Sequence, residues 1–291
     1  MGKIAIVTDS TAAISESEAA KLGNVFVVPI TVTINDQVFR EGIDITNEKF
    51  YSTLTTLKKL PTTAPPTPQE MLDTYDKLVN AGYDQIISIH LTSGITGFIN
   101  NLKMIVSGYP KAKVFVFDSH ISIEAMGYMV RYASALANSG EDVTNIISKL
   151  KDVRASLNEY FVVDDLKNLV TGGRLTNAAA FAGSVLKIKP ILTLNDQHEI
   201  VAIDKIRTLK KARRFIEGKF ADVYQQSNFP LHVILTGTNN ASAISDWQAE
   251  MKTKFPNATF ETGQIGPVVG THLGSNAFVI LWLKQVPELN K

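Results

Sequence analysis

The chain has 291 residues, of which 45% are hydrophobic, 20% charged and 8% aromatic, and its formal net charge is +1. This length fits one large domain or two of ordinary size, with ample material for a core. The near-neutral charge argues against a nucleic-acid partner, and the lack of cysteine excludes disulfides, thiolate chemistry and cysteine-based zinc sites.

The first half repeats a pattern of strand, polar turn and helix. Short apolar runs that are typical of buried parallel strands lie at 3–8, 85–90 and 114–117, and two further strands are expected within 25–38 around an Asn35-Asp36 turn. Helices are expected at 15–22, 47–57, 68–80, 98–106, 123–139 and 143–157. This alternation predicts right-handed parallel crossovers and an α/β, Rossmann-like layer.

Polar residues and prolines separate these elements. Asp9, Ser10 and Thr11 are expected to cap the helix after the first strand. Four prolines fall between 61 and 68, and because proline lacks a backbone donor, this segment predicts an extended loop. Thr67 then caps the following helix, with Pro68 at its first position.

The second half has a different rhythm. Strands are expected at 160–163, 190–194, 199–205, 232–236 and 259–262, and helices at 166–170, 177–186, 208–220 and 241–255. Hairpins mixed with helices predict an α+β domain with a mostly antiparallel sheet. We therefore expect an N-terminal α/β domain at 1–158 and a C-terminal α+β domain at 159–291.

The segment from 263 to 277 is the most informative stretch. Four glycines and Pro267 surround His272 there. Glycine at this density marks backbone that turns tightly or approaches another group closely, and an imidazole can bond or take a proton near neutral pH. By itself, the segment also fits a glycine-rich turn between a strand and a last helix.

Four loops together offer groups that suit an anion with two oxygens. They are Thr62-Thr63, Thr92-Ser93-Gly94, Gly172-Gly173-Arg174 and Gly270-Thr271-His272. Hydroxyls and helix N-terminal amides favour negative charge, and a guanidinium matches a carboxylate or phosphate.

Each of these side chains also has an ordinary structural explanation. Ser93 fits a helix cap, Thr63 can satisfy backbone in its loop, Arg174 fits a surface position, and His272 fits a structural hydrogen bond. A serine triad of Ser93 and His272 with Asp9 or Asp118 is conceivable, but the sequence around Ser93 is not the Gly-x-Ser-x-Gly elbow.

Cofactor motifs are absent from the sequence. No Walker sequence occurs, no Gly-x-Gly-x-x-Gly follows the first strand, and the five histidines have no metal-ligand spacing. We expect neither a metal nor a cofactor. The N-terminal segment lacks a signal-peptide run, and 277–283 is too short to span a membrane, so we expect a soluble cytoplasmic protein without stable membrane insertion.

An ordered set of motifs resembles the DegV family of bacterial fatty-acid-binding proteins. It comprises Ile-Val-Thr-Asp-Ser-Thr at 6–11, Pro-Thr-Thr-Ala-Pro-Pro-Thr-Pro at 61–68, Thr-Ser-Gly-Ile-Thr-Gly at 92–97, Phe-Asp-Ser at 117–119, Gly-Gly-Arg-Leu at 172–175, Leu-Lys-Ile-Lys-Pro-Ile-Leu at 186–192 and Ile-Gly-Pro-Val-Val-Gly-Thr-His-Leu-Gly at 265–274.

The resemblance implies a non-enzymatic carrier that holds one long-chain fatty acid, of about 16 to 18 carbons, in an apolar tunnel between its domains. Matching the motifs places the carboxylate on Thr63, Ser93 and Gly94, with His272 and Arg174 near the same head group. It also implies a separate fatty acid kinase that phosphorylates the carboxylate for phospholipid synthesis. The remaining alternatives are a serine-dependent lipid hydrolase or acyltransferase, and a lipid sensor without a kinase partner.

The chain departs from the family pattern at three places. Thr-Ser-Gln-Pro-Ser becomes Thr63-Ala-Pro-Pro-Thr, the first serine of the Ser-Ser-Gly turn becomes Thr92, and Gly-Pro-Gly after the histidine becomes Gly274-Ser-Asn. The last change lies where a kinase surface is expected.

Overall fold

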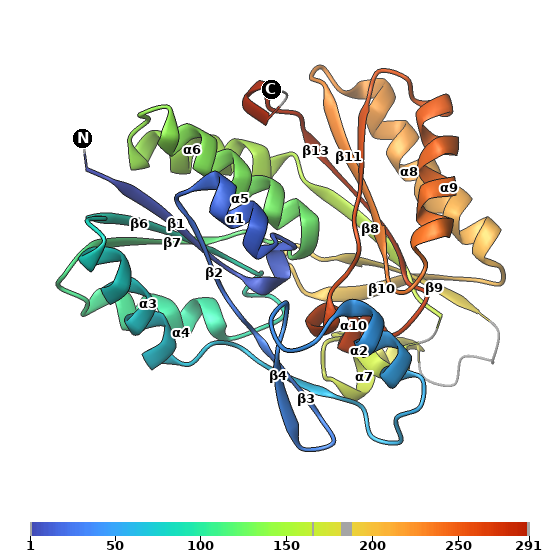
Figure 1. Ribbon diagram of the computed structural model, residues 1–291. Coiled ribbons are helices and arrows are strands. Elements are labelled where there is room, and N and C mark those ends of the chain that lie inside the picture. The colour runs from blue at the N-terminus through green and yellow to red at the C-terminus, as the bar shows by residue number, and fades with distance from the viewer. Residues whose placement is uncertain (1, 165, 182–187, 290–291) are drawn as a thin grey trace.

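The computed structural model describes residues 2–164, 166–181 and 188–289. Its first sheet has four parallel strands in the order β2 (Val25–Val28), β1 (Ile4–Asp9), β6 (Gln85–His90) and β7 (Lys113–Asp118). Helices α1 (Glu16–Leu22), α5 (Ile123–Asn138) and α6 (Val143–Ala155) lie on one face, and α3 (Pro68–Asn80) and α4 (Phe98–Ser107) on the other (Figure 1). The predicted parallel α/β layer is confirmed.

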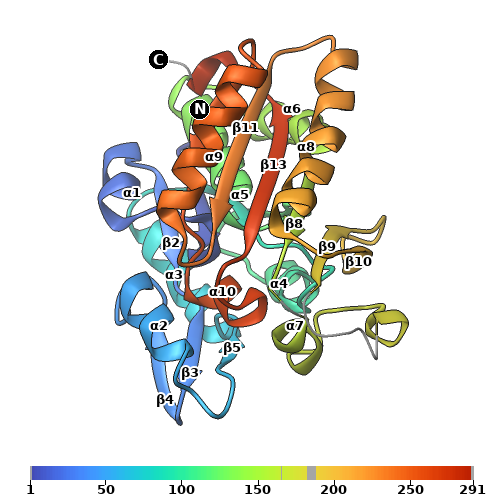
Figure 2. The ribbon, with the colours of Figure 1, turned by 90° about the vertical axis from the view of Figure 1, so that its right-hand side faces the viewer.

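The second sheet is mixed and has six strands. Their order is β10 (Ile200–Ile206), β9 (Lys189–Leu194), β8 (Asn158–Val162), β13 (Phe278–Lys284), β11 (Leu231–Gly237) and β12 (Thr259–Thr262). Among the strand pairs of this sheet in the described residues, only β11–β12 is parallel, which confirms the mostly antiparallel prediction. Helices α8 (Leu209–Gln226) and α9 (Ala241–Lys254) pack side by side on one face of this sheet (Figure 2).

A third, small sheet carries the proline-rich segment. It joins β4 (Gln37–Arg40), β3 (Thr31–Ile34) and β5 (Thr62–Ala64), all antiparallel. The segment is extended as expected, but it pairs as an edge strand, a position that tolerates flanking prolines. Helices α2 (Asn47–Leu54), α7 (Lys167–Thr171) and α10 (Pro267–Leu273) lie beside this sheet at the bottom of Figure 1.

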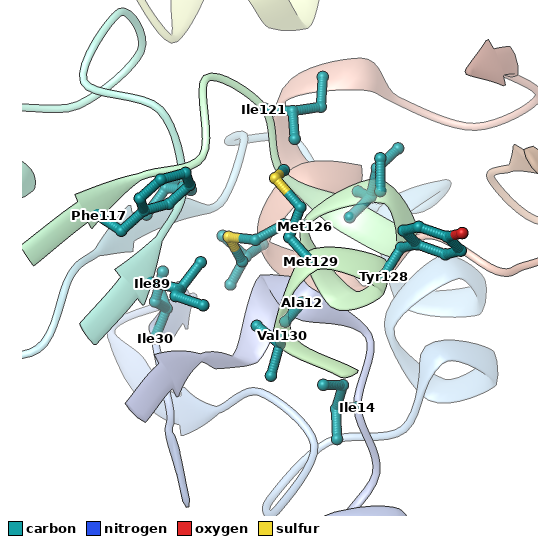
Figure 3. Close-up of a cluster of buried hydrophobic side chains, with 14 of the residues drawn as sticks. Ala12, Ile14, Ile30, Ile89, Phe117, Ile121, Met126, Tyr128, Met129 and Val130 are labelled. Carbon is teal, nitrogen blue, oxygen red and sulfur yellow. The ribbon is translucent and has the colours of Figure 1, made fainter. Parts of the chain in front are cut away.

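Helix α5 lies between the two large sheets and contacts β1 and β6 on one side and β11 and β13 on the other. Figure 3 shows Met126 and Met129 pointing toward Ile89 and Phe117 of the parallel sheet, whereas Tyr128 points away from them. The Tyr128 hydroxyl accepts a hydrogen bond from the backbone of Val286, near the C-terminus. Because α5 packs against both sheets, the division at residue 158 stays a prediction, although β8 does begin there.

The last two elements differ from expectation. His272 lies in the last turn of α10 rather than in a loop, because Pro267 starts a short helix that ends at Gly274, with φ of +73°. The segment that follows is a strand, not a last helix. Six of the seven residues of β13 are buried, and periodicity alone does not distinguish a fully buried strand from a buried helix.

Four local predictions were also wrong. Two strands were expected within 25–38, but three begin there, namely β2, β3 and β4. Asp9 caps the short 3-10 helix η1 (Ser10–Ala12), while Ser15 caps α1. The expected helix at 177–186 is the 3-10 turn η2 (Ala178–Phe181), and the rest of it lies outside the described residues. Helix α8 runs past 220 to Gln226 because Val223 and Tyr224 also pack against the core. One more 3-10 helix, η3 (Pro287–Leu289), follows β13.

Two helical glycines give a matched test of how closely α5 is packed. A Cβ at Gly127 would stand 2.2 Å from the Ala12 carbonyl oxygen, whereas a Cβ at Gly218 would meet nothing within 4 Å. Replacing a helical glycine by alanine gains about 0.5–1 kcal/mol where space allows. We therefore expect Gly218→Ala to stabilise the fold by that amount and Gly127→Ala to destabilise it by about 1–3 kcal/mol.

Urea unfolding followed by circular dichroism measures both changes. Equal free energies of unfolding for Gly127→Ala and Gly218→Ala would contradict the close packing of α5 against η1.

Candidate functional site

A largely apolar pocket lies between the two halves of the chain. It contains about 940 Å³ of space free of protein atoms, part of it open to solvent. Leu91, Ile95 and Ile123 form its wall on one side, and Phe161, Val279 and Leu281 on the other. Mostly apolar walls with a few polar side chains among them are typical of a small-molecule site.

The pocket meets the parallel sheet where its strand order reverses. Strand β2 lies on one side of β1, and β6 lies on the other side. The carboxyl ends of β1 and β6 therefore form a topological switch point, the place where open α/β sheets usually bind ligands. Asp9, at the end of β1, accepts the backbone N–H groups of Thr11 and Leu91. This buried carboxylate therefore positions the loop that leads to Thr92, which lines the pocket.

Asp9 belongs to a buried polar chain. Its Oδ2 lies 3.0 Å from Nδ1 of His90, whose Nε2 lies 2.7 Å from the Ser88 hydroxyl, and that hydroxyl lies 2.8 Å from the hydroxyl of Tyr75. The side chains of Asp9 and His90 are fully buried. A fully satisfied network of this kind rigidifies the core around it, and here it holds the ends of β1 and β6.

Helix α10 is held by three groups from the first half. Glu41 accepts the backbone N–H of Val268 at 2.8 Å, the Tyr51 hydroxyl donates to the Ile265 carbonyl at 2.8 Å, and Thr63 Oγ1 lies 3.0 Å from His272 Nε2. A Cβ at Gly270 would stand 2.3 Å from the Tyr51 hydroxyl. The glycines thus permit close contact between the helix and the first half.

Three of the predicted ligand residues meet at one end of the pocket. Thr63, Arg174 and His272 all line it. The Arg174 guanidinium donates to the Gly172 carbonyl at 2.7 Å. Burial, and secondarily the charge of Arg174, lowers the pKa of His272 to about 4. At neutral pH this end therefore presents a hydroxyl, a neutral imidazole and one fixed positive charge.

Ser93 and Gly94 lie just outside this group. The Ser93 backbone N–H donates to the Asp118 carboxylate at 3.2 Å, and the pocket wall here is formed by Thr92, Ile95 and Thr96. A Cβ at Gly94 would stand 2.1 Å from the His198 carbonyl oxygen, so this turn packs directly against the β9–β10 hairpin. The role of Ser93 and Gly94 as ligands stays a prediction.

The hydrogen bonds do not assemble the conceivable serine triad. Asp9 pairs with His90, and His272 pairs with Thr63. Within the described part of the chain, no hydrogen bond joins Ser93 Oγ to His272. Over the same residues, no group of three or more histidines and carboxylates could hold a metal ion, and no helix is long and apolar enough to cross a membrane.

Two carboxyl groups at the site, the buried Glu41 and the half-buried Glu159, were missed from the sequence. Burial raises the pKa of Glu41, which holds α10, to about 7 despite bonds from Ser10 and Val268. Burial likewise raises the pKa of Glu159, in the pocket wall, to about 7 despite bonds from Leu194 and Thr193. Because side chains alternate along a strand, Glu159 lies on the same face of β8 as Phe161. An acidic residue on an otherwise apolar strand face was the sequence feature that could have revealed Glu159. Nothing local to Glu41 indicates its role.

Comparison with known proteins identifies the family. A family model described as "Uncharacterised protein, DegV family" matches residues 3–285. This chain belongs to the DegV family. A DegV domain-containing protein of Listeria monocytogenes is 38% identical to it over 280 residues, which are 96% of this chain and 98% of the relative.

Solved DegV structures share the whole fold. The crystal structure of Bacillus subtilis DegV, described as a fatty acid binding protein, matches with a TM-score of 0.88 and 34% identity over 98% of this chain and 100% of that one. A fatty acid binding DegV family protein from Streptococcus agalactiae matches with a TM-score of 0.90 and 26% identity, with the same coverage.

The buried Glu41 makes the stability of this DegV protein depend on pH. Its folded pKa of about 7 exceeds the ordinary value of 4.5, so between these values the folded state binds more protons and stability falls as pH rises. A glutamine amide in its place can accept the Val268 N–H and donate to Ser10 without carrying charge. We expect the free energy of unfolding of Glu41→Gln to exceed that of the wild type by on the order of 3 kcal/mol at about pH 8. Near pH 4.5 the two proteins should differ little in stability.

Urea unfolding across this pH range measures the difference, with Glu48→Gln as the matched control because Glu48 is exposed. A difference between Glu41→Gln and the wild type that stays constant with pH would contradict the prediction.

Proposed function

We propose that this protein is a fatty-acid carrier that holds one long-chain fatty acid in the pocket and has no catalytic turnover of its own. The observation that carries the proposal is the pocket itself, with apolar walls and a polar end at Thr63, Arg174 and His272. The B. subtilis and S. agalactiae relatives, both described as fatty acid binding, support it.

The acyl tail supplies most of the affinity. Burying roughly 15 methylenes of a chain of about 16 to 18 carbons, at about 0.8 kcal/mol each, outweighs what a few head-group bonds add. The head group then needs orientation and satisfied hydrogen bonds, because an unpaired buried carboxylate is costly.

The Thr63–His272 contact suits a carboxylate ligand. If the neutral imidazole donates its Nε2–H to Thr63 Oγ1, the threonine hydroxyl is free to donate to a fatty-acid oxygen. Arg174 adds charge complementarity at the same end. Ser93 and Gly94 reach the carboxylate after a small movement of their turn, and the two domains, 1–158 and 159–291, then close over it.

The carrier presents its bound carboxylate to a separate fatty acid kinase in the cytoplasm. Phosphoryl transfer forms an acyl phosphate, which feeds phospholipid synthesis. Arg174 and His272 stabilise charge on that product at the mouth of the pocket. The kinase contacts the segment after α10, where Ser275 and Asn276 stand.

We expect Ser93→Ala combined with Thr63→Val to weaken fatty-acid binding about 10- to 100-fold, since hydrogen bonds to a charged group contribute about 1.5–3 kcal/mol. Displacement of a fluorescent fatty acid measures the change. Ser245→Ala with Thr253→Val, on the exposed face of α9, is the matched control. Native mass spectrometry of the wild type should show the added mass of one fatty acid. A wild type that takes up none would rule the carrier out, and an unchanged double variant would rule out this carboxylate site.

Kinase presentation has its own test. A mixture of this protein, a bacterial fatty acid kinase, ATP and a bound fatty acid should form acyl phosphate, and omitting the carrier should abolish it. Fatty-acid binding without acyl phosphate would favour the lipid sensor. Turnover of an ester substrate that Ser93→Ala abolishes would favour the hydrolase or acyltransferase.

A further inference from the structure

One acidic side chain stands in the wall of the apolar pocket. Glu159 lies on β8, where its neighbour across the strand pair is Leu281, and the next inward-facing pair is Phe161 and Val279. All four side chains line the pocket. Glu159 is therefore part of the surface along which a bound acyl chain would lie.

Glu159 lies away from the polar end of the pocket formed by Thr63, Arg174 and His272. Strand β13 leads away from α10, so the Glu159–Leu281 pair lies two residues, or about 7 Å, farther from that helix than Phe161 and Val279. The ligand carboxylate does not belong beside Glu159, because two carboxylates repel each other. Glu159 faces the chain, not the head group.

The carboxyl group of Glu159 has one oxygen held and one oxygen free. Oε1 accepts the Leu194 N–H at 2.8 Å and the Thr193 hydroxyl at 2.9 Å, which fixes the side chain. Over the described residues, no hydrogen bond reaches Oε2. A plain hydrocarbon chain packed over it would remove water and offer no replacement bond, which is unfavourable.

We propose that Glu159 selects fatty acids that carry a hydroxyl group in the middle of the acyl chain. The hydroxyl donates to Oε2 and completes the hydrogen bonding of a side chain that the protein already holds in place. Because burial raises the pKa of Glu159 to about 7, the group also occurs protonated, and it can then donate to the same hydroxyl oxygen. This inference rests on the proposed fatty-acid carrier.

The test compares stearate with two hydroxystearates, one hydroxylated in mid-chain and one beside the carboxyl. Each displaces a fluorescent fatty acid from the wild type, Glu159→Leu, Glu159→Gln and the exposed control Glu48→Leu. We expect the preference for mid-chain hydroxystearate over stearate to fall about tenfold in Glu159→Leu and to persist in Glu159→Gln and Glu48→Leu. The isomer hydroxylated beside the carboxyl should show no such dependence on residue 159.

The outcomes separate this inference from the carrier function. If no fatty acid displaces the probe from the wild type, the carrier itself fails. If stearate binds and the preference is the same in the wild type and Glu159→Leu, only the selection by Glu159 fails. Should Glu159→Leu not fold, the wild type decides: mid-chain hydroxystearate must bind at least as tightly as stearate, because burying an unpaired hydroxyl would weaken it.

Discussion

The packing of α10 against the first half of the chain is the contact on which the polar end of the pocket depends. Glu41 binds the backbone at the start of this helix, Tyr51 binds the backbone just before it, and Thr63 contacts His272 in its last turn. The N–H groups at the helix N-terminus offset only part of the cost of burying the Glu41 carboxyl group, because burial still raises its pKa to about 7. Without this contact, His272 would not face Thr63, and the pocket would lack its polar end.

The frame behind that contact is rigid on both sides. Helix α5 fills the space between the two large sheets, and the chain from Asp9 through His90 to Tyr75 holds the ends of β1 and β6. The loops that line the pocket therefore project from an ordered scaffold, which is how α/β folds usually present their sites. The pocket lies where this scaffold meets the wall formed by β8 and β13.

Polarity within the pocket is divided along its length. A neutral histidine, a threonine and an arginine stand at one end, and apolar side chains form most of the wall, with Glu159 as the acidic exception. This division suits an amphipathic ligand with one charged end. Burial governs the titration of Glu41, Glu159 and His272 alike, because it penalises whichever form carries the charge.

The sequence by itself determined the alternation of strands and helices and the two kinds of sheet, because the spacing of apolar residues is a local signal. Proline and threonine positions determined the capped helix at Pro68, and the order of motifs determined the family. The sequence also put forward Thr63, Arg174 and His272, which line one pocket. Only the tertiary structure decided that 278–284 is a central strand, since a run buried on both faces has no distinguishing period. It also decided that His272 lies in the last turn of a helix. Glu41 was likewise invisible, because its partner Val268 lies 227 residues away in the sequence and only folding brings the two together.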